Sequence, residues 1–295
     1  MKKLIFKGSG VALVTPFNPD MTVNYDALER LLEFQIENGT DSIISCGTTG
    51  EAATLSAKEH LEVIDFTVKK VRGRVPVIAG TGSNDTMFAV ELSKEAEALG
   101  VDGVLLVTPY YNKTSQRGLI ESFSYIADQV KTPCIVYNVP SRTGLNILPE
   151  TYYALSKHPN IVAAKEANHD ISALTKTISL CGDDLAIYSG EDVQTLPIIA
   201  LGGVGVISVF ANILPKEMHD LSMAALENDI PKARSMTLKY VDLMNALFMD
   251  VSPIPVKAAL NKMGFDCGSC RLPLTDLSES DAQKLFAELA KHVDL

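Results

Sequence analysis

The sequence predicts an α/β protein, a (β/α)8 TIM barrel with a C-terminal helical appendage. Three observations predict it: eight short apolar segments recur, segments of helical periodicity separate them, and the repeat is about 25 residues long. The chain has 295 residues, 46% of them hydrophobic and 21% charged, a composition that excludes disordered, collagen-like and coiled-coil proteins. Length alone also allows two doubly wound halves.

The predicted strands are each about five residues long and rich in Val, Ile and Leu without polar alternation, which is typical of strands buried on both faces of a parallel sheet. They are expected at 11–14, 42–46, 76–79, 103–107, 133–137, 161–165, 185–189 and 204–209. Eight strands are enough to close a barrel. A doubly wound sheet would need a Gly-rich phosphate turn after its first strand, and the sequence there is Thr15-Pro16-Phe17.

Helical periodicity predicts helices between these strands, at 25–38, 57–71, 86–99, 116–130 and 171–181. Glycines at or near the helix ends are expected to form left-handed caps, namely Gly39, Gly73, Gly100 and Gly182. The uncharged segment 193–215 is long enough to span a membrane, but Pro197 and several glycines interrupt it. We expect a buried strand and loops there.

The barrel is predicted to occupy residues 1–225 and to contain the active site. Residues 226–295 form the predicted C-terminal three-helix region, with helices at 230–249, 255–262 and 279–292. This region is too small for a catalytic domain of its own, and its expected use is assembly.

Charge and cysteine content restrict the partners and the compartment. A formal net charge of −10 argues against a nucleic-acid partner. The five cysteines are scattered, which favours a reducing compartment, and Cys267 and Cys270 form the one close pair. No second pair or His cluster accompanies them, so we favour two incidental thiols over a redox or zinc site. The apolar stretch at the N-terminus, residues 4–6, ends before Lys7 and a turn predicted at Gly8 to Gly10. It is too short for a signal peptide, so we expect a cytoplasmic protein without membrane attachment.

Chemistry in such a barrel takes place at the carboxyl ends of the strands. The second predicted strand leads into Gly47-Thr48-Thr49-Gly50-Glu51, a turn whose hydroxyls and backbone amides can hold a carboxylate. The fourth leads into Thr108-Pro109-Tyr110-Tyr111-Asn112, and the fifth into Tyr137-Asn138-Val139-Pro140-Ser141-Arg142-Thr143-Gly144. Each of the last two segments is a weak signal by itself.

The sixth predicted strand is more informative because it ends in a lysine. Strand alternation places Ile161, Ala163 and Lys165 on one face and Glu166 on the other. A buried lysine either pairs with a nearby carboxylate or has its pKa lowered by desolvation, so that the free amine can attack a carbonyl carbon. We favour the second interpretation, which is Schiff-base chemistry.

An imine mechanism also needs groups that transfer protons. Tyr137, one strand earlier, is a suitable donor and acceptor, and Thr48 and Tyr111 can extend a hydrogen-bonded relay. The five histidines have no metal-ligand spacing, and no cluster of acidic residues is expected at the strand ends, so we expect neither a metal nor another cofactor. The absence of a Walker sequence argues against a nucleotide phosphate site.

Five motifs in order resemble the dihydrodipicolinate synthase family, which belongs to the pyruvate-dependent class I aldolase barrels. They are the three segments quoted above together with Lys165-Glu166-Ala167 and Gly202-Gly203-Val204-Gly205-Val206-Ile207-Ser208. The resemblance extends from about residue 6 to the C-terminus. It implies an enzyme that condenses pyruvate with L-aspartate 4-semialdehyde in diaminopimelate and lysine biosynthesis, and a homotetramer built as a dimer of dimers.

The resemblance also implies catalytic roles. Lys165 would form the imine with pyruvate, and Tyr137 would relay protons together with Thr48 and Tyr111. In the family, the tyrosine that matches Tyr111 reaches across a dimer interface into the neighbouring site. The dimer would then be the smallest active unit.

Substrate-binding roles follow in the same way. Thr48 and Thr49 would hold the pyruvate carboxylate, Ile207 would contact substrate through its backbone, and Gly190 would line the pocket. Arg142 would bind the carboxylate of the semialdehyde as a bidentate partner. Relatives that cleave sugar acids lack the Ser-Arg-Thr-Gly sequence, so an N-acetylneuraminate lyase-like or 2-keto-3-deoxygluconate-type aldolase is the second hypothesis. A catalytically silent ligand-binding barrel is the third.

Members of the family that are inhibited by lysine have an allosteric pocket near the dimer interface. The matching positions here are Ala53, Ala57, His60, Asn84, Phe88 and Tyr110. Inhibited members usually have a His in place of Ala57 and an acidic residue in place of Phe88. A lysine ammonium needs a carboxylate partner in a poorly solvated pocket, so we predict weak or absent feedback by lysine.

Overall fold

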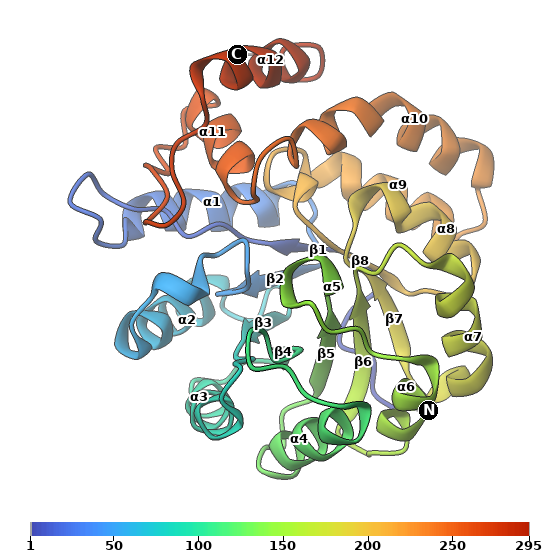
Figure 1. Ribbon diagram of the computed structural model, residues 1–295. Helices are drawn as coiled ribbons and strands as arrows, with labels where there is room; N and C mark the ends of the chain where they lie inside the picture. The colour runs from blue at the N-terminus through green and yellow to red at the C-terminus, as the bar shows by residue number, and fades with distance from the viewer. Residues whose placement is uncertain (1, 295) are drawn as a thin grey trace.

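The computed structural model describes residues 2–294, which form a closed barrel of eight parallel strands surrounded by helices (Figure 1). Each strand pairs with the next in sequence, and β8 pairs with β1. The strands are β1 (Gly8–Ala12), β2 (Ser42–Ser45), β3 (Val77–Gly80), β4 (Gly103–Val107), β5 (Cys134–Asn138), β6 (Ile161–Glu166), β7 (Ala186–Ser189) and β8 (Gly205–Ser208). The predicted fold class is confirmed.

The first strand begins three residues earlier than predicted. Gly8 and Gly10 suggested a turn in the sequence, but both lie in β1, where neighbouring groups leave no room for a side chain. A Cβ atom on Gly10 would lie 2.7 Å from Ile44 Cδ1 and 2.8 Å from Phe6 Cζ. The glycines therefore allow close packing inside the barrel.

Helices follow the strands and surround the barrel, except for the short helix at Pro140–Thr143, which lies over one end of the barrel (Figure 1). They are α1 (Tyr25–Glu37), α2 (Ala57–Val71), α3 (Thr86–Ala98), α4 (Gln116–Asp128), α5 (Pro140–Thr143), α6 (Pro149–Ser156), α7 (Ile171–Cys181), α8 (Thr195–Ala200) and α9 (Pro215–Leu226). The helices predicted at 57–71 and 171–181 have the observed bounds. Gly39, Gly73, Gly100 and Gly182 have positive φ, as expected of left-handed caps.

The interpretation of 193–215 as a strand with loops was incomplete, because α8 also lies there. Pro197 is the third residue of this helix, where a missing N–H costs no intrahelical hydrogen bond. Within residues 2–294, no helix combines the length and apolar character needed to cross a bilayer.

The strand side chains form two apolar layers. One fills the barrel interior, with Ile44, Ile78, Leu105 and Ile135 among its members, and the other lies between the strands and the helices. Phe6 precedes β1 and stacks on Tyr188, with ring centroids 4.4 Å apart. Both residues belong to the interior layer, and the Tyr188 hydroxyl donates to the Phe6 carbonyl oxygen at 2.7 Å.

The last three helices are α10 (Ile230–Ala246), α11 (Ile254–Lys262) and α12 (Glu279–Leu289). They confirm the predicted helical appendage, although α10 and α12 each end three residues earlier than predicted. Figure 1 shows α10 beside α9, and α11 with α12 beyond α1. The domain boundary between 225 and 226 stays a prediction, and Met1 and Leu295, at the outer limits of the two predicted domains, lie outside the described residues.

Candidate active site

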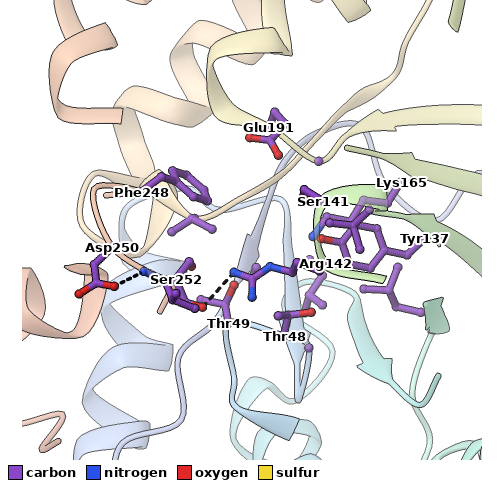
Figure 2. Close-up of a pocket in the computed structure, with 18 residues that line it drawn as sticks. Thr48, Thr49, Tyr137, Ser141, Arg142, Lys165, Glu191, Phe248, Asp250 and Ser252 are labelled. Atoms are coloured by element: carbon purple, nitrogen blue, oxygen red, sulfur yellow. Dashed lines mark hydrogen bonds between the residues drawn. The ribbon is translucent and has the colours of Figure 1, made fainter. Parts of the chain in front are cut away.

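A cavity of about 360 Å³ lies at the carboxyl ends of the barrel strands (Figure 2). The barrel contributes most of its lining, including Thr48, Tyr137 and Lys165. The appendage contributes the rest through the connection between α10 and α11, with Phe248, Asp250, Val251 and Ser252. This contribution was not predicted, because assembly was the expected use of the C-terminal region.

Lys165 projects from β6 into the cavity and is buried, as strand alternation predicted. Burial lowers the pKa of its amine to about 8, although the nearby Glu191 and Asp192 act to raise it. Among the described ion pairs, none includes Lys165, so the interpretation of a carboxylate-paired lysine is not supported. At pH 7 about a tenth of such an amine is unprotonated and nucleophilic.

Tyr137 lies directly across the strand pair from Lys165. The two are register partners on β5 and β6, and the lysine Nζ is 4.2 Å from the centroid of the tyrosine ring. Burial raises the pKa of the Tyr137 hydroxyl well above its ordinary value, so the hydroxyl carries its proton at neutral pH. The phenol can therefore donate a proton to a group bound at the lysine.

The next residue on each strand points away from the cavity. Glu166 and Asn138 are also register partners, and Asn138 Nδ2 donates to both carboxylate oxygens at 3.0 and 3.2 Å. The Tyr152 hydroxyl and the Asn168 backbone N–H donate to the same carboxylate at 2.6 and 2.8 Å. Burial raises the pKa of Glu166 to about 7. This network fixes the ends of β5 and β6, and so the spacing of Tyr137 and Lys165.

Two adjacent acidic residues, Glu191 and Asp192, follow β7. Glu191 lines the cavity, while Asp192 is buried and accepts hydrogen bonds from the backbone N–H groups of Val209 and Phe210. This acidic pair at the end of β7 was not predicted from the sequence. Burial raises the pKa of both carboxyls. Across residues 2–294, no group of three or more His, Cys, Asp or Glu side chains is arranged to hold a metal ion.

The turn after β2 brings Thr48 and Thr49 to the cavity wall. Its conformation depends on Gly50, because a Cβ there would lie 3.1 Å from the Leu13 carbonyl oxygen and 3.2 Å from Cys46 Cα. The Thr15 hydroxyl donates to the Gly50 carbonyl at 2.7 Å. The hydrogen bond from Thr15 and the close packing at Gly50 fix the turn, so that both threonines line the cavity.

Arg142, in α5, reaches the cavity from the side of β5. Its Nη2 donates to the Ser252 carbonyl oxygen at 2.9 Å (Figure 2). Within the described residues its other guanidinium N–H groups have no hydrogen-bond partner. They are available to a ligand carboxylate.

The remaining predicted residues have mixed outcomes. Gly190 lines the cavity, where a Cβ would lie 2.8 Å from that of Ala167. Ile207 is buried in the barrel interior and is not among the cavity-lining residues, whereas Val209 is. Tyr111 is 91% exposed and lines no part of this cavity within its own chain.

A second cavity, of about 470 Å³, adjoins the first and shares Thr48, Tyr137 and Arg142 with it. Of the six positions matched to an allosteric pocket, Ala53, His60, Phe88 and Tyr110 line it. Glu51 is the one carboxylate among its described lining residues, and it is bound by Lys257.

The five cysteines are free and buried in the described structure. Burial raises the pKa of Cys46, Cys267 and Cys270 to about 12, so these thiols are protonated at neutral pH. The favoured interpretation of Cys267 and Cys270 as incidental thiols agrees with this geometry.

A lysine with a lowered pKa at the end of the sixth strand, beside a protonated tyrosine, defines a Schiff-base aldolase barrel, a class of lyase. A family model matches residues 5–292, and the chain belongs to the family it describes, the dihydrodipicolinate synthetase family.

Individual relatives are similar over nearly the whole length. The 4-hydroxy-tetrahydrodipicolinate synthase of Acetivibrio thermocellus is 55% identical over 285 residues, 97% of each chain. That of Caldicellulosiruptor saccharolyticus is 56% identical over 281 residues, 95% of each chain. The crystal structure of a chloride-inhibited dihydrodipicolinate synthase from Acinetobacter baumannii, complexed with pyruvate, has a TM-score of 0.95 at 44% identity and covers 96% of this chain and 98% of its own.

Proposed function

We propose that the chain is a 4-hydroxy-tetrahydrodipicolinate synthase, which condenses pyruvate with L-aspartate 4-semialdehyde. The observation that carries the proposal is the buried Lys165 amine opposite Tyr137, in a cavity that also contains the unoccupied donors of Arg142. The similarity to named synthases supports the same reaction.

The first half-reaction takes place at Lys165. The free amine attacks the ketone carbon of pyruvate, and the carbinolamine loses water to give an imine. Thr48 and Thr49 bind the pyruvate carboxylate through hydroxyl and amide groups, and Tyr137 supplies and removes protons. Loss of a methyl proton from the imine then gives the enamine nucleophile. The site needs no cofactor for these steps.

The second half-reaction uses Arg142. Its guanidinium binds the carboxylate of the semialdehyde and directs the aldehyde toward the enamine carbon. After the carbon–carbon bond forms, the acceptor's amino group displaces Lys165 from the imine carbon, which closes the ring and regenerates the free amine. Gly190 leaves space for the adduct, and we retain a backbone contact from Ile207 as part of the proposal.

We propose a homotetramer built as a dimer of dimers, in which Tyr111 of the partner subunit completes the proton relay with Tyr137 and Thr48. The exposure of Tyr111, at 91%, and its position outside the cavity of its own chain support a role in another subunit's site. The five free, buried thiols are consistent with the reducing cytoplasm, which is the proposed location.

The choice of acceptor tests the function. Purified protein is given pyruvate with L-aspartate 4-semialdehyde, or pyruvate with N-acetylmannosamine or glyceraldehyde, and pyruvate consumption is followed. We expect pyruvate to be consumed when L-aspartate 4-semialdehyde is the acceptor, and not when either of the other two acceptors replaces it. Consumption with a sugar alone would instead identify a sugar-acid aldolase, and no consumption with any acceptor would favour a binding protein.

A further inference from the structure

The turn that carries Thr48 and Thr49 ends at Glu51, which is not among the residues that line the cavity around Lys165. Glu51 has a left-handed backbone, with φ of 54°, and its carboxylate is almost completely buried. Lys257 of α11 donates to Glu51 Oε1 at 2.9 Å. The Lys257 side chain is 2% exposed and the Glu51 side chain 1%. An ion pair buried this fully joins the appendage to the cavity turn.

Lys257 and Glu51 each make further contacts that hold the pair in this position. Lys257 Nζ also donates to the Ser269 carbonyl at 2.9 Å and lies 4.3 Å from the centroid of the Phe17 ring. The second carboxylate oxygen of Glu51 accepts the Arg271 backbone N–H at 2.9 Å. Within residues 2–294, the hydrogen bonds of the Glu51 carboxylate therefore come from the appendage.

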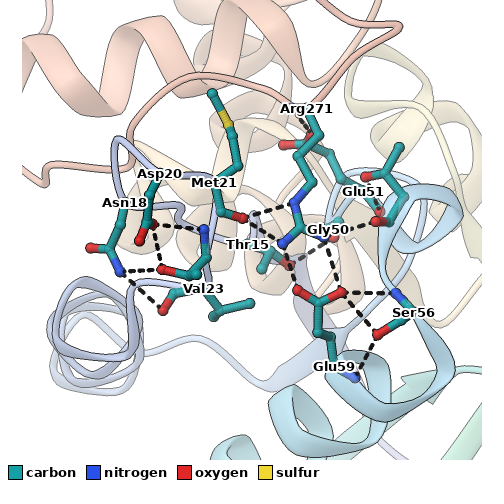
Figure 3. A network of polar contacts seen from close by, with 12 residues as sticks. Thr15, Asn18, Asp20, Met21, Val23, Gly50, Glu51, Ser56, Glu59 and Arg271 are labelled. Carbon is teal, nitrogen blue, oxygen red and sulfur yellow. Dashed lines mark hydrogen bonds and ion pairs between the residues drawn. The ribbon is translucent and has the colours of Figure 1, made fainter.

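Arg271 extends these contacts to the helix after the turn (Figure 3). Its guanidinium forms an ion pair with Glu59 of α2 at 2.6 Å and donates to the Thr54 and Met21 carbonyls. Ser56 is the N-cap of α2, and the Glu59 carboxylate accepts its backbone N–H. The hydrogen bonds from Arg271 lower the pKa of Glu59 to about 2. The segment from Glu51 to Glu59 is thus bound at both ends by one short stretch of the appendage.

We infer that Lys257 is a positioning residue for the pyruvate-binding turn, acting through Glu51. Thr48 and Thr49 lie three and two residues before Glu51, so a change in the position of the Glu51 carboxylate changes the direction of their hydroxyl and amide groups. The appendage then has a function within each active site in addition to any function in assembly. The inference rests on the proposed function, because it concerns pyruvate as the ligand of this turn.

The test measures how much pyruvate is needed to trap the enzyme covalently. Full-length protein is incubated with increasing pyruvate, reduced with borohydride, and the fraction that carries the adduct is read by mass spectrometry. Lys257→Met removes the charge but keeps the length of the side chain. We expect the half-saturating pyruvate concentration to rise about tenfold, while trapping at saturation stays complete. The matched control Lys262→Met, at an exposed position of the same helix, is expected to leave both values unchanged.

Glu51→Gln is the second variant and carries the test if Lys257→Met does not fold. Its amide oxygen keeps one acceptor while the charge is lost, and we expect a rise of about threefold. Circular dichroism verifies that each assayed variant is folded. An unchanged half-saturating concentration in a folded variant would overturn the inference, as would an equal shift in Lys262→Met. Failure of the unmodified protein to trap pyruvate would instead overturn the proposed function.

Discussion

Tyr137 and Lys165 face each other across β5 and β6, with the lysine Nζ 4.2 Å from the centroid of the tyrosine ring. Adjacent parallel strands hold both side chains, so their spacing is set by backbone hydrogen bonds and not by a flexible loop. The proposed nucleophile and the proposed proton donor are thereby held in place by the barrel itself.

Tyr137→Phe keeps the ring beneath the amine and removes only the hydroxyl. We expect kcat to fall about 100- to 1000-fold, because the proton transfers lose their positioned donor. At saturating pyruvate and after a long incubation, borohydride should still trap pyruvate on this variant. A turnover number within a few-fold of the unmodified enzyme would contradict the assigned role.

The pH dependence of imine formation should follow the titration of Lys165. Its lowered pKa, about 8, means that the free amine increases as pH rises from about 6 to about 9, with a midpoint near pH 8, and levels off above that range. Glu191 favours the charged amine, so Glu191→Gln should move the midpoint to lower pH. Initial rates of pyruvate trapping across this pH range provide the measurement. A midpoint that stays in place or moves upward would show that Glu191 does not act on the amine.

The network around Glu166 should contribute to stability as well as to alignment. Tyr152→Phe removes a 2.6 Å hydrogen bond to a buried carboxylate, and we expect the free energy of unfolding to fall by about 1.5–3 kcal/mol. The control Tyr153→Phe alters the neighbouring, exposed tyrosine and should change it by less than about 0.5 kcal/mol. Denaturant unfolding of both variants is the measurement, and equal losses would contradict the proposed importance of this bond.

Arg142 should be needed for the reaction with L-aspartate 4-semialdehyde and not for the binding of pyruvate. Arg142→Ala should form the pyruvate adduct normally, whereas kcat/KM for the semialdehyde falls about 100- to 1000-fold. Arg117→Ala, at an exposed site on α4, is the control. Loss of pyruvate trapping in Arg142→Ala would mean that this residue holds pyruvate instead.

Lysine is expected to have little effect on the rate. Phe88 places a ring in the second cavity where an acidic residue would be needed, and Glu51 is already bound by Lys257. Millimolar lysine should leave initial rates unchanged at several pyruvate concentrations. Abolition of activity by lysine would refute this prediction.

Local patterns predicted the parts of the site that depend on a single strand. Strand alternation was sufficient to predict that Lys165 points into the barrel and Glu166 out of it, since successive side chains of any strand point to opposite faces. Gly8 and Gly10 were misread because their role depends on distant residues: Asp41 lies against Gly8, and Ile44 and Phe6 lie against Gly10.

The contribution of the appendage could not be derived from periodicity. Lys257 meets Glu51 across 206 residues of sequence, and such a contact leaves no local pattern. A weaker signal was present, since Lys257 is a single charge among the apolar residues of 254–260. The reasoning applied to Lys165 would have identified it as a buried lysine that requires a partner.

The central claim is that Lys165 forms a covalent imine with pyruvate. The most direct test incubates the protein with pyruvate, reduces it with borohydride, and locates the added mass by peptide mapping. We predict one reduced adduct per chain, on the peptide that contains Lys165, and none in Lys165→Ala. An unmodified protein, or an adduct on another lysine, would contradict the mechanism.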